Sequence, residues 1–321
     1  MKHAFHVKKT VWLALMLGPG ISTAAIAQSN VTIYGYLDVG IVKESRTSTR
    51  ESRGLNNWLG FKGSEALGGD LSAVFKLEMR FLPDTGAQER STTLFQGEST
   101  AGLSSKSLGT LLIGRAWTPL WAGKWAYDPW YDSAMMGSLG AYNGDFDSDG
   151  LNLNKVFANY SRVSNALFYR SPNFADFQFS LVGEVESVPG ARKRSRGGAL
   201  QYGHGPVSAM LAYEKNHVAD DVVYAGASYT MGPVVLMGSY SRTHLFFLNT
   251  SSHSAMVAAT YAIGNGMLRG GYGRIKESHA NKTSAGYVHK LSKRTSVYAD
   301  VYRERISRKQ DGVALGITHS F

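Results

Sequence analysis

The side chains most suited to chemistry gather in one stretch of the chain, residues 114–162. Arg115 and Arg162 stand near its two ends, with several aspartates between them. Facing acids and bases can orient a charged solute, whereas two paired carboxylates can serve as the acid and base of a glycosidase. The acids of this stretch are Asp128, Asp132, Asp145, Asp147 and Asp149.

Other motifs in the sequence point away from catalysis. Residues 145–150 resemble the start of a calcium-binding loop, but Val156 stands where the bidentate glutamate belongs, so a weak divalent site or a solvated loop is expected. The chain has no cysteine, and its nine histidines show no metal-ligand spacing. A phosphate-binding loop and a nucleophile elbow are absent from the sequence. We therefore expect no catalytic residue, no metal and no cofactor.

The stretch itself must be held by other elements. It has no clean period over roughly forty residues, and a connection that long is usually functional or disordered. Its aromatic content argues against disorder, since disordered segments are poor in aromatic residues. The tryptophans are Trp117, Trp121, Trp125 and Trp130. We interpret the stretch as an ordered loop that packs inside a larger structure.

The rest of the chain alternates between apolar and polar residues, which is the pattern of strands with two different faces. In residues 70–82, one face carries Leu71, Ala73, Phe75, Leu77, Met79 and Phe81, and the other carries Ser72, Val74, Lys76, Glu78 and Arg80. About sixteen segments follow this pattern, near residues 31–42, 57–65, 70–82, 93–104, 107–116, 157–171, 177–185, 199–203, 207–213, 222–231, 234–242, 254–262, 266–276, 284–291, 295–304 and 312–321.

The connections between these segments alternate between short turns and longer loops, which is the layout of an up-and-down barrel. The polar faces carry charges and should be wet, and sixteen strands enclose more space than side chains can fill. We therefore predict an all-β fold, a sixteen-stranded antiparallel transmembrane barrel with lipid outside and water inside. A soluble sandwich or lipocalin-like barrel is the alternative. The charged residues assigned to the polar faces are Asp38, Lys62, Lys76, Glu78, Arg80, Arg115, Arg162, Arg170, Asp300 and Arg303.

The first 27 residues differ from the rest. A basic start at Lys2, Lys8 and Lys9 precedes a short apolar run, and Ala25–Ala27 fits a small-residue cleavage site. We predict a signal peptide over residues 1–27 and a single barrel domain over residues 28–321. Removing three lysines leaves a formal charge of +10 − 3 = +7.

Several short motifs then identify a family. In order along the chain they are Val31–Gly35 with Asp38, Leu59–Glu65, Leu67–Gly69, Gly102–Ser104, Leu108–Thr110, Gly114–Arg115, Tyr169–Pro172, Leu291–Arg294 and the closing Gly316, His319 and Phe321. Together they resemble the trimeric general porins of Gram-negative outer membranes, and the likeness covers the whole mature chain. In that family, the third loop folds into the lumen and narrows it.

The resemblance implies a constriction between basic wall residues and loop acids. Arg115 and Arg162 match family positions, and Asp128 and Asp132 are the acidic candidates. Trp58 stands where the family often has a third arginine, and Arg80 could partly replace it. The predicted lumen wall adds Lys62, Lys76, Glu78, Arg170 and Trp58.

The expected function is passive diffusion of small hydrophilic solutes and ions across the outer membrane, with a weak anion preference. A substrate-selective channel for small organic anions is the alternative. An outer-membrane hydrolase would need a catalytic cluster that the sequence lacks, and an adhesive barrel would conduct nothing. The resemblance implies a homotrimer in contact with outer-membrane lipid and lipopolysaccharide. The basic run of residues 192–196 would lie on an outer loop, so no nucleic-acid partner is expected.

Overall fold

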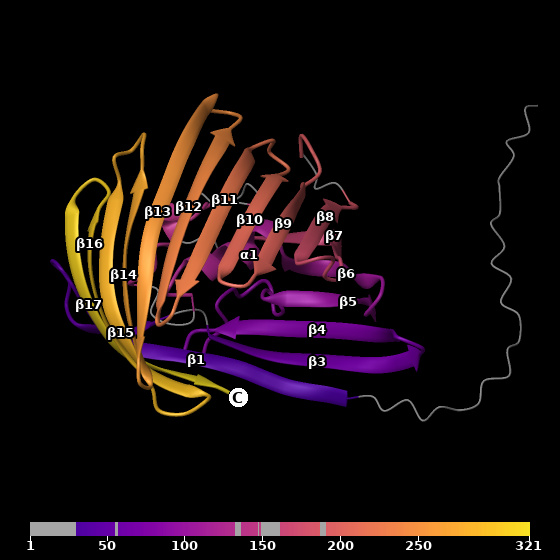
Figure 1. Cartoon of the computed structure of the whole chain (residues 1–321), viewed down its shortest axis with the longest axis horizontal. Helices are drawn as coiled ribbons and strands as arrows, with labels where there is room; N and C mark the ends of the chain where they lie inside the picture. The colour runs from indigo at the N-terminus through magenta and orange to yellow at the C-terminus, as the bar shows by residue number, and fades with distance from the viewer. Residues whose placement is uncertain (1–29, 55–56, 132–135, 147, 149–160, 187–190) are drawn as a thin grey trace, which may run out of the picture.

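The computed structural model describes residues 30–54, 57–131, 136–146, 148, 161–186 and 191–321. Seventeen strands within these residues form one antiparallel sheet that closes on itself (Figure 1). None of the helices in the described part of the chain is long and apolar enough to cross a membrane. The predicted signal peptide lies outside the described residues.

The elements follow one another with each strand beside the next. The strands are β1 (Asn30–Glu44), β2 (Arg50–Arg53), β3 (Asn57–Gly68), β4 (Leu71–Phe81), β5 (Glu98–Ser105), β6 (Gly109–Trp117), β7 (Arg162–Arg170), β8 (Phe177–Glu184), β9 (Arg196–His204), β10 (Val207–Lys215), β11 (Asp221–Met231), β12 (Val234–Leu245), β13 (Thr250–Ile263), β14 (Gly266–Ile275), β15 (Asn281–Lys290), β16 (Thr295–Arg305) and β17 (Lys309–Ser320). The connection from β6 to β7 holds helix α1 (Pro119–Lys124) and the 3-10 turns η1 (Trp125–Tyr127) and η2 (Gly140–Tyr142).

Two of the seventeen strands are pieces of one barrel strand. β2 pairs with residues 39–42 of β1 and β3 pairs with residues 30–36, while β17 pairs with β1 over residues 36–44. The break includes Gly54, which lies against the Asp38 carboxylate. Any residue with a side chain would clash there, because its Cβ atom would lie 2.1 Å from the carboxylate oxygens. Asn57 then bonds the Asp38 backbone, its side-chain amide donating to the Asp38 carbonyl at 3.2 Å. The sixteen-stranded barrel is therefore confirmed, with its second strand interrupted.

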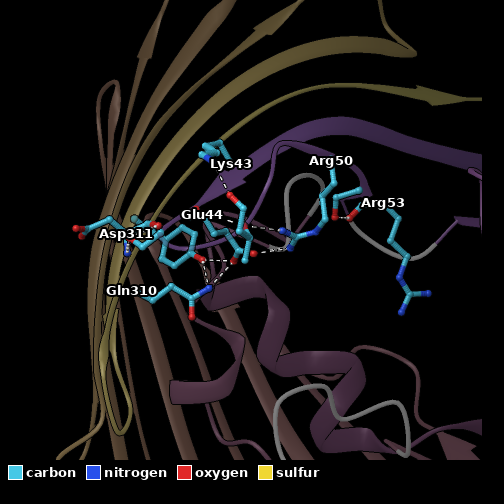
Figure 2. A network of polar contacts seen from close by, with 10 residues as sticks. Lys43, Glu44, Arg50, Arg53, Gln310 and Asp311 are labelled. Carbon is cyan, nitrogen blue, oxygen red and sulfur yellow. Dashed lines mark hydrogen bonds and ion pairs between the residues drawn. The ribbon is translucent and has the colours of Figure 1, made fainter.

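The barrel closes where β1 meets β17, and polar contacts hold both ends of this seam. At one end, Glu44 accepts hydrogen bonds from Arg50, from Gln310 at 2.8 Å, and from the Tyr302 hydroxyl (Figure 2). At the other end, the backbones of Gly35 and Phe321 exchange two N–H···O bonds of 3.0 and 3.1 Å. The C-terminus accordingly lies beside β1 in Figure 1.

The two faces of the wall have opposite character. Large apolar side chains such as Ile113, Leu211 and Leu315 are exposed on the outer face. Alternate residues point inward, and many of them are buried and polar, including Asp38 and Asp300. This inverts the arrangement of a soluble protein, and it suits a wall with lipid outside.

Described residues of the long connection between β6 and β7 pack against the wall. Its residues Trp130, Leu139 and Tyr142 share a buried cluster with residues of β1 and of β13, β15, β16 and β17. A second buried cluster joins Leu120 and Tyr127 of the same connection to side chains of β9, β10 and β11. Burial of these aromatic side chains holds the described part of a segment that has no regular period. We call the described residues of this connection, 118–131, 136–146, 148 and 161, the inner loop.

Candidate functional site

Carboxylates of the wall hold the inner loop in place, and the first stands at the start of α1. Thr118 caps this helix by accepting a hydrogen bond from the backbone N–H of Trp121 at 3.3 Å. The buried Glu214 of β10 accepts from the backbone N–H of Leu120 at 2.8 Å. A carboxylate near exposed N–H groups of a first helical turn is favourable, because those groups have no partner within the helix.

A buried ion pair fixes the middle of the loop. Asp300 of β16 receives hydrogen bonds from Arg269 Nε at 3.1 Å, Arg269 Nη2 at 2.9 Å and Trp130 Nε1 at 2.8 Å. Arg269 of β14 also donates to the carbonyl of Pro129 at 3.2 Å. Because a buried carboxylate is costly unless it is paired and hydrogen-bonded, these partners specify one position for Trp130.

The end of the described loop is held in the same way. The Tyr142 hydroxyl donates to Glu304 of β16 at 2.8 Å. The side-chain oxygen of Asn143 accepts from the Tyr224 hydroxyl at 2.8 Å and from Ser239 at 2.6 Å. Three wall acids, Glu214, Asp300 and Glu304, therefore bind the loop.

Sequence reasoning missed these anchors. Period-2 alternation could place Asp300 and Glu304 on the inner face, but it could not show which inner acids the loop would cover. Arg303 was wrongly grouped with Asp300. The two residues are three positions apart, so they point to opposite faces, and Arg303 is outside, paired with Asp311 at 2.6 Å.

Lys124 ends α1 with its side chain fully buried inside the loop. Its ammonium group donates to the carbonyl of Gly144 at 3.3 Å and lies 3.8 Å from the centre of the Trp121 ring. Burial lowers the pKa of Lys124 to about 8, and the nearby charges of Asp145 and Asp128 oppose that shift. This lysine was not singled out from the sequence, where it reads as a helix-end cation.

The structure gives Asp128 a different environment from the one expected of a constriction acid. It is 3% exposed and accepts hydrogen bonds from Ser138 Oγ at 2.7 Å and from the backbone N–H groups of Trp130 and Leu139 at 3.0 and 3.1 Å. Burial raises the pKa of its carboxyl. Asp128 thus organises the loop. Asp132, Asp147 and Asp149 lie outside the described residues.

The predicted arginines come together on the opposite wall. Arg80 and Arg162 are 4% and 2% exposed, and the charges of Arg80, Arg115 and Arg162 are close enough to repel one another. Arg162 donates to the carbonyl of Gly97 and lies 5.1 Å from the Trp117 ring centre. Arg115 follows Gly114, which has a positive φ at a register shift, and donates to Ser164 at 2.8 Å.

Acidic side chains partly offset this basic group. Glu89 lies 3.9 Å from Arg80 and pairs with Arg53, which sequence reasoning had not considered. Glu78 is buried beside the group and accepts from the Tyr34 hydroxyl at 3.0 Å. The local excess of positive charge is therefore small.

Further along the same wall, Lys62 and Lys76 face each other in the sheet register. Their ammonium groups lie 5.1 and 5.7 Å from the centre of the Tyr34 ring. Lys76 also pairs with Glu98 at 2.8 Å. A cation over an aromatic face is attracted by the ring quadrupole, which helps to hold two like charges side by side.

The other two predicted wall residues stand at separate places. Trp58 is the register partner of Arg80, and its ring stacks on Tyr36 with 4.6 Å between ring centres. Arg170 lies at the far end of β7, on the same face as the buried Ala166 and Phe168. Over the described residues, no group of three or more His, Cys, Asp or Glu could hold a metal ion.

A closed barrel with an apolar outer belt, a charged interior and a loop across its inner wall defines an outer-membrane channel. The Gram-negative porin family model matches residues 12–309. The chain therefore belongs to the Gram-negative porin family.

Individual relatives agree over nearly the whole chain. Outer membrane porin protein 32 of Delftia acidovorans is 28% identical, over 98% of this chain and 99% of that protein. The anion-selective porin from Comamonas acidovorans superposes with a TM-score of 0.76 at 26% identity, over 92% of this chain and 100% of that chain. An in vitro folded outer membrane protein of Vibrio cholerae in trimer form shares the fold, with a TM-score of 0.68 at 13% identity, over 91% of this chain and 99% of that one.

Proposed function

We propose that this porin lets small hydrophilic solutes and ions diffuse passively across the outer membrane, with a weak preference for anions. The observation that carries the preference is the unequal use of charge inside the barrel. Glu214, Asp300 and Glu304 accept hydrogen bonds from the loop or from Arg269, whereas five basic residues gather on the wall from β3 to β7, namely Lys62, Lys76, Arg80, Arg115 and Arg162.

The preference is weak for two reasons. Glu78, Glu89 and Glu98 lie among the basic residues and reduce the local excess of positive charge. In addition, charges in contact with electrolyte act over only about 8–10 Å at physiological salt, so the nearest residues decide and the net charge does not. Arg80, Arg115 and Arg162 are the residues proposed to set the constriction, with Asp128 and Asp132 as the weaker acidic candidates.

Single-channel recording in a planar bilayer with a salt gradient tests this proposal. We expect a reversal potential on the anion side, larger at low salt. Replacing Arg115 and Arg162 together by Ser should move it toward cations. A matched control, Lys293→Ser with Arg294→Ser, removes the same charge from the turn between β15 and β16 and should leave it in place. A cation-selective wild type, or equal shifts in both variants, would contradict the assignment.

The alternative is a channel with selective affinity for small organic anions. The stacked Tyr36 and Trp58 rings, in register with Arg80, favour it, because an aromatic face beside a guanidinium suits a carboxylate with an apolar body. Such a channel should show a conductance for benzoate that saturates with concentration, and Trp58→Ala should abolish the saturation. A linear dependence in the wild type would leave simple diffusion.

For assembly, we infer a homotrimer in contact with outer-membrane lipid and lipopolysaccharide. The trimer form of the Vibrio cholerae protein and the exposed apolar belt support this inference. Cross-linking of detergent-extracted protein at low concentration should yield a three-chain species, and monomers alone would contradict it. No enzymatic activity is proposed, because the relatives described above are channel proteins.

A further inference from the structure

The outer face of the barrel has a hollow of about 810 Å³ where β15, β16, β17 and β1 run side by side. Three rows of paired residues form it. The middle row is Glu44, Gly312, Tyr302 and Ser284, and the side chains of Glu44, Tyr302 and Ser284 point inward and are buried. The residues on either side of that row point outward, so the hollow opens to the outside of the barrel.

The two outward rows differ in chemistry. The row nearer the membrane centre contains Ala285, Val301 and Val313, the two valines being 53% and 42% exposed, and it ends at Lys43. The row nearer the loops contains Thr283, Arg303 and Asp311. The hollow is therefore apolar toward the middle of the wall and charged toward its loop end.

Cations dominate this charged end. Arg303 pairs with Asp311, with Nε 2.6 Å from one carboxylate oxygen and Nη2 3.3 Å from the other, which fixes the guanidinium plane. Lys43 donates to the carbonyl of Thr47, which uses one of its three N–H donors. Arg305 and Lys309 continue the outward rows above the hollow. Four cations thus stand against one acid.

We propose that this hollow binds a phosphorylated lipid of the outer leaflet, with an acyl chain over Ala285, Val301 and Val313 and a phosphate between Lys43 and Arg303. Basic groups directly beyond an apolar band are the arrangement that holds a lipid headgroup, since the two ends of the molecule meet matching surfaces. Arg303, oriented by Asp311, supplies directed donors, and Lys43 supplies a mobile point charge. The inference rests on the proposed contact with outer-membrane lipid and lipopolysaccharide, and it gives that contact a location.

Native mass spectrometry of the full folded protein, titrated with bisphosphorylated lipid A, tests the site. Lys43→Ser with Arg303→Ser should weaken lipid binding about 30-fold, because each cation near a headgroup contributes roughly a factor of five. The matched control is Arg242→Ser with Arg274→Ser, which removes two outward cations near the loop ends of β12 and β14, away from the hollow. It should change binding less than twofold.

A second variant separates shape from charge. Ala285→Trp keeps every charge and fills the hollow, and it should also reduce lipid binding. Lipid A without phosphates should bind the wild type weakly and respond little to the loss of Lys43 and Arg303. Unaltered conductance of all variants confirms that the barrel is folded.

Three outcomes would overturn the proposal. If the hollow variant and the control lose lipid equally, lipid contact is general and this site is not special. If lipid A with and without phosphate binds equally, the phosphate is not recognised. A change in oligomeric state with lipid binding intact would assign the hollow to contact with a second copy of the chain.

Discussion

At Lys124, burial and charge are in direct conflict. The pKa falls from 10.5 to about 8, which corresponds to a burial cost on the order of 3 kcal/mol for the charged form. The carbonyls of Gly140 and Gly144 and the faces of Trp121 and Trp125 offset part of that cost. A lysine in such a cage couples the packing of the inner loop to pH.

This coupling makes the folded protein more stable as the pH rises. Below pH 8 the folded and unfolded chains both carry the proton, so the full burial cost opposes folding. Between pH 8 and 10.5 only the unfolded chain keeps it, and stability rises with pH over this window. We expect Lys124→Met to be at least as stable as the wild type at pH 7 and to lose up to about 3 kcal/mol of that relative advantage by pH 10.5. Thermal midpoints of both proteins at pH 7, 9 and 10.5 measure this, and a constant difference would contradict it.

Trp130 offers a test of a single hydrogen bond. Trp130→Phe keeps a ring in the buried cluster but removes the donor to Asp300, and a bond to a charged group contributes about 1.5–3 kcal/mol. The loop should loosen, which single-channel recording would detect as added current noise. The chain provides its own control, because the Trp117 indole N–H has no hydrogen-bond partner among the residues that the structure describes. Trp117→Phe loses similar volume, so equal effects of the two changes would show that the Asp300 bond does not hold the loop.

At the scale of elements, the ends of β1 and β17 show how the barrel closes. A Cβ atom at Gly35 would lie 2.2 Å from the Phe321 ring, so only glycine lets the terminal ring lie there. Gly35→Ala should displace Phe321 and destabilise the barrel by roughly 1–3 kcal/mol, as overpacking commonly does. Gly203→Ala is the control, because no atom of the described residues lies within 4 Å of its added Cβ atom. The fraction of protein that keeps folded mobility on an unheated gel would report the difference.

Deleting Phe321 removes more of the same contact between β1 and the C-terminus. The family resemblance implies that the terminal residue acts as an assembly signal. In the structure its backbone also forms two hydrogen bonds with Gly35. Deletion should therefore lower outer-membrane yield more than Gly35→Ala does, because it removes these bonds together with the ring. A normal yield after deletion would count against both roles.

Strands were predictable from the sequence because their period is local, whereas breaks and starts depend on distant residues. Alternation in residues 70–82 predicts β4 almost to the residue. The break before Asn57 depends on the Asp38 side chain, which the register brings to Gly54. The expected strand over 93–104 begins only at Glu98, after Gln96 bonds Glu89. No local pattern could show either contact.

The site was predictable to a smaller extent for the same reason. Arg80 and Arg162 were placed together by face and by resemblance, and the structure does bring them together. Asp128 was a candidate as an acid in the Tyr127–Asp132 run of the loop, yet hydrogen bonds within the loop enclose it. A carboxylate in an aperiodic segment carries no sign of whether it points to water or to backbone N–H groups.

At the scale of the whole molecule, the uneven distribution of charge inside the barrel should produce an electric field across its width. Acids on the β10–β16 side are engaged by the inner loop or by Arg269 of β14, whereas Lys62, Lys76, Arg80, Arg115 and Arg162 stand on the β3–β7 side. The proposed preference for anions would follow from this, because a polar solute between the two sides turns its negative end toward the basic wall. The strength of this field should fall as salt rises.

The last prediction follows from the inside-out arrangement of the barrel, with an apolar outer face and a charged inner face. Because the chain has no cysteine, single cysteines report the environment of one position each. Lys62 is exposed on the inner face, and Ile113 is 54% exposed on the outer face. Lys62 is chosen over Arg80, which also faces inward, because only 4% of Arg80 is exposed. In native membranes, a membrane-impermeant maleimide should label Lys62→Cys and spare Ile113→Cys, because lipid covers the latter. After transfer to detergent and denaturation, both should react. Labelling of position 113 with protection of position 62 in the membrane would mean that the apolar face does not meet lipid, and the assignment of the two faces would then be reversed.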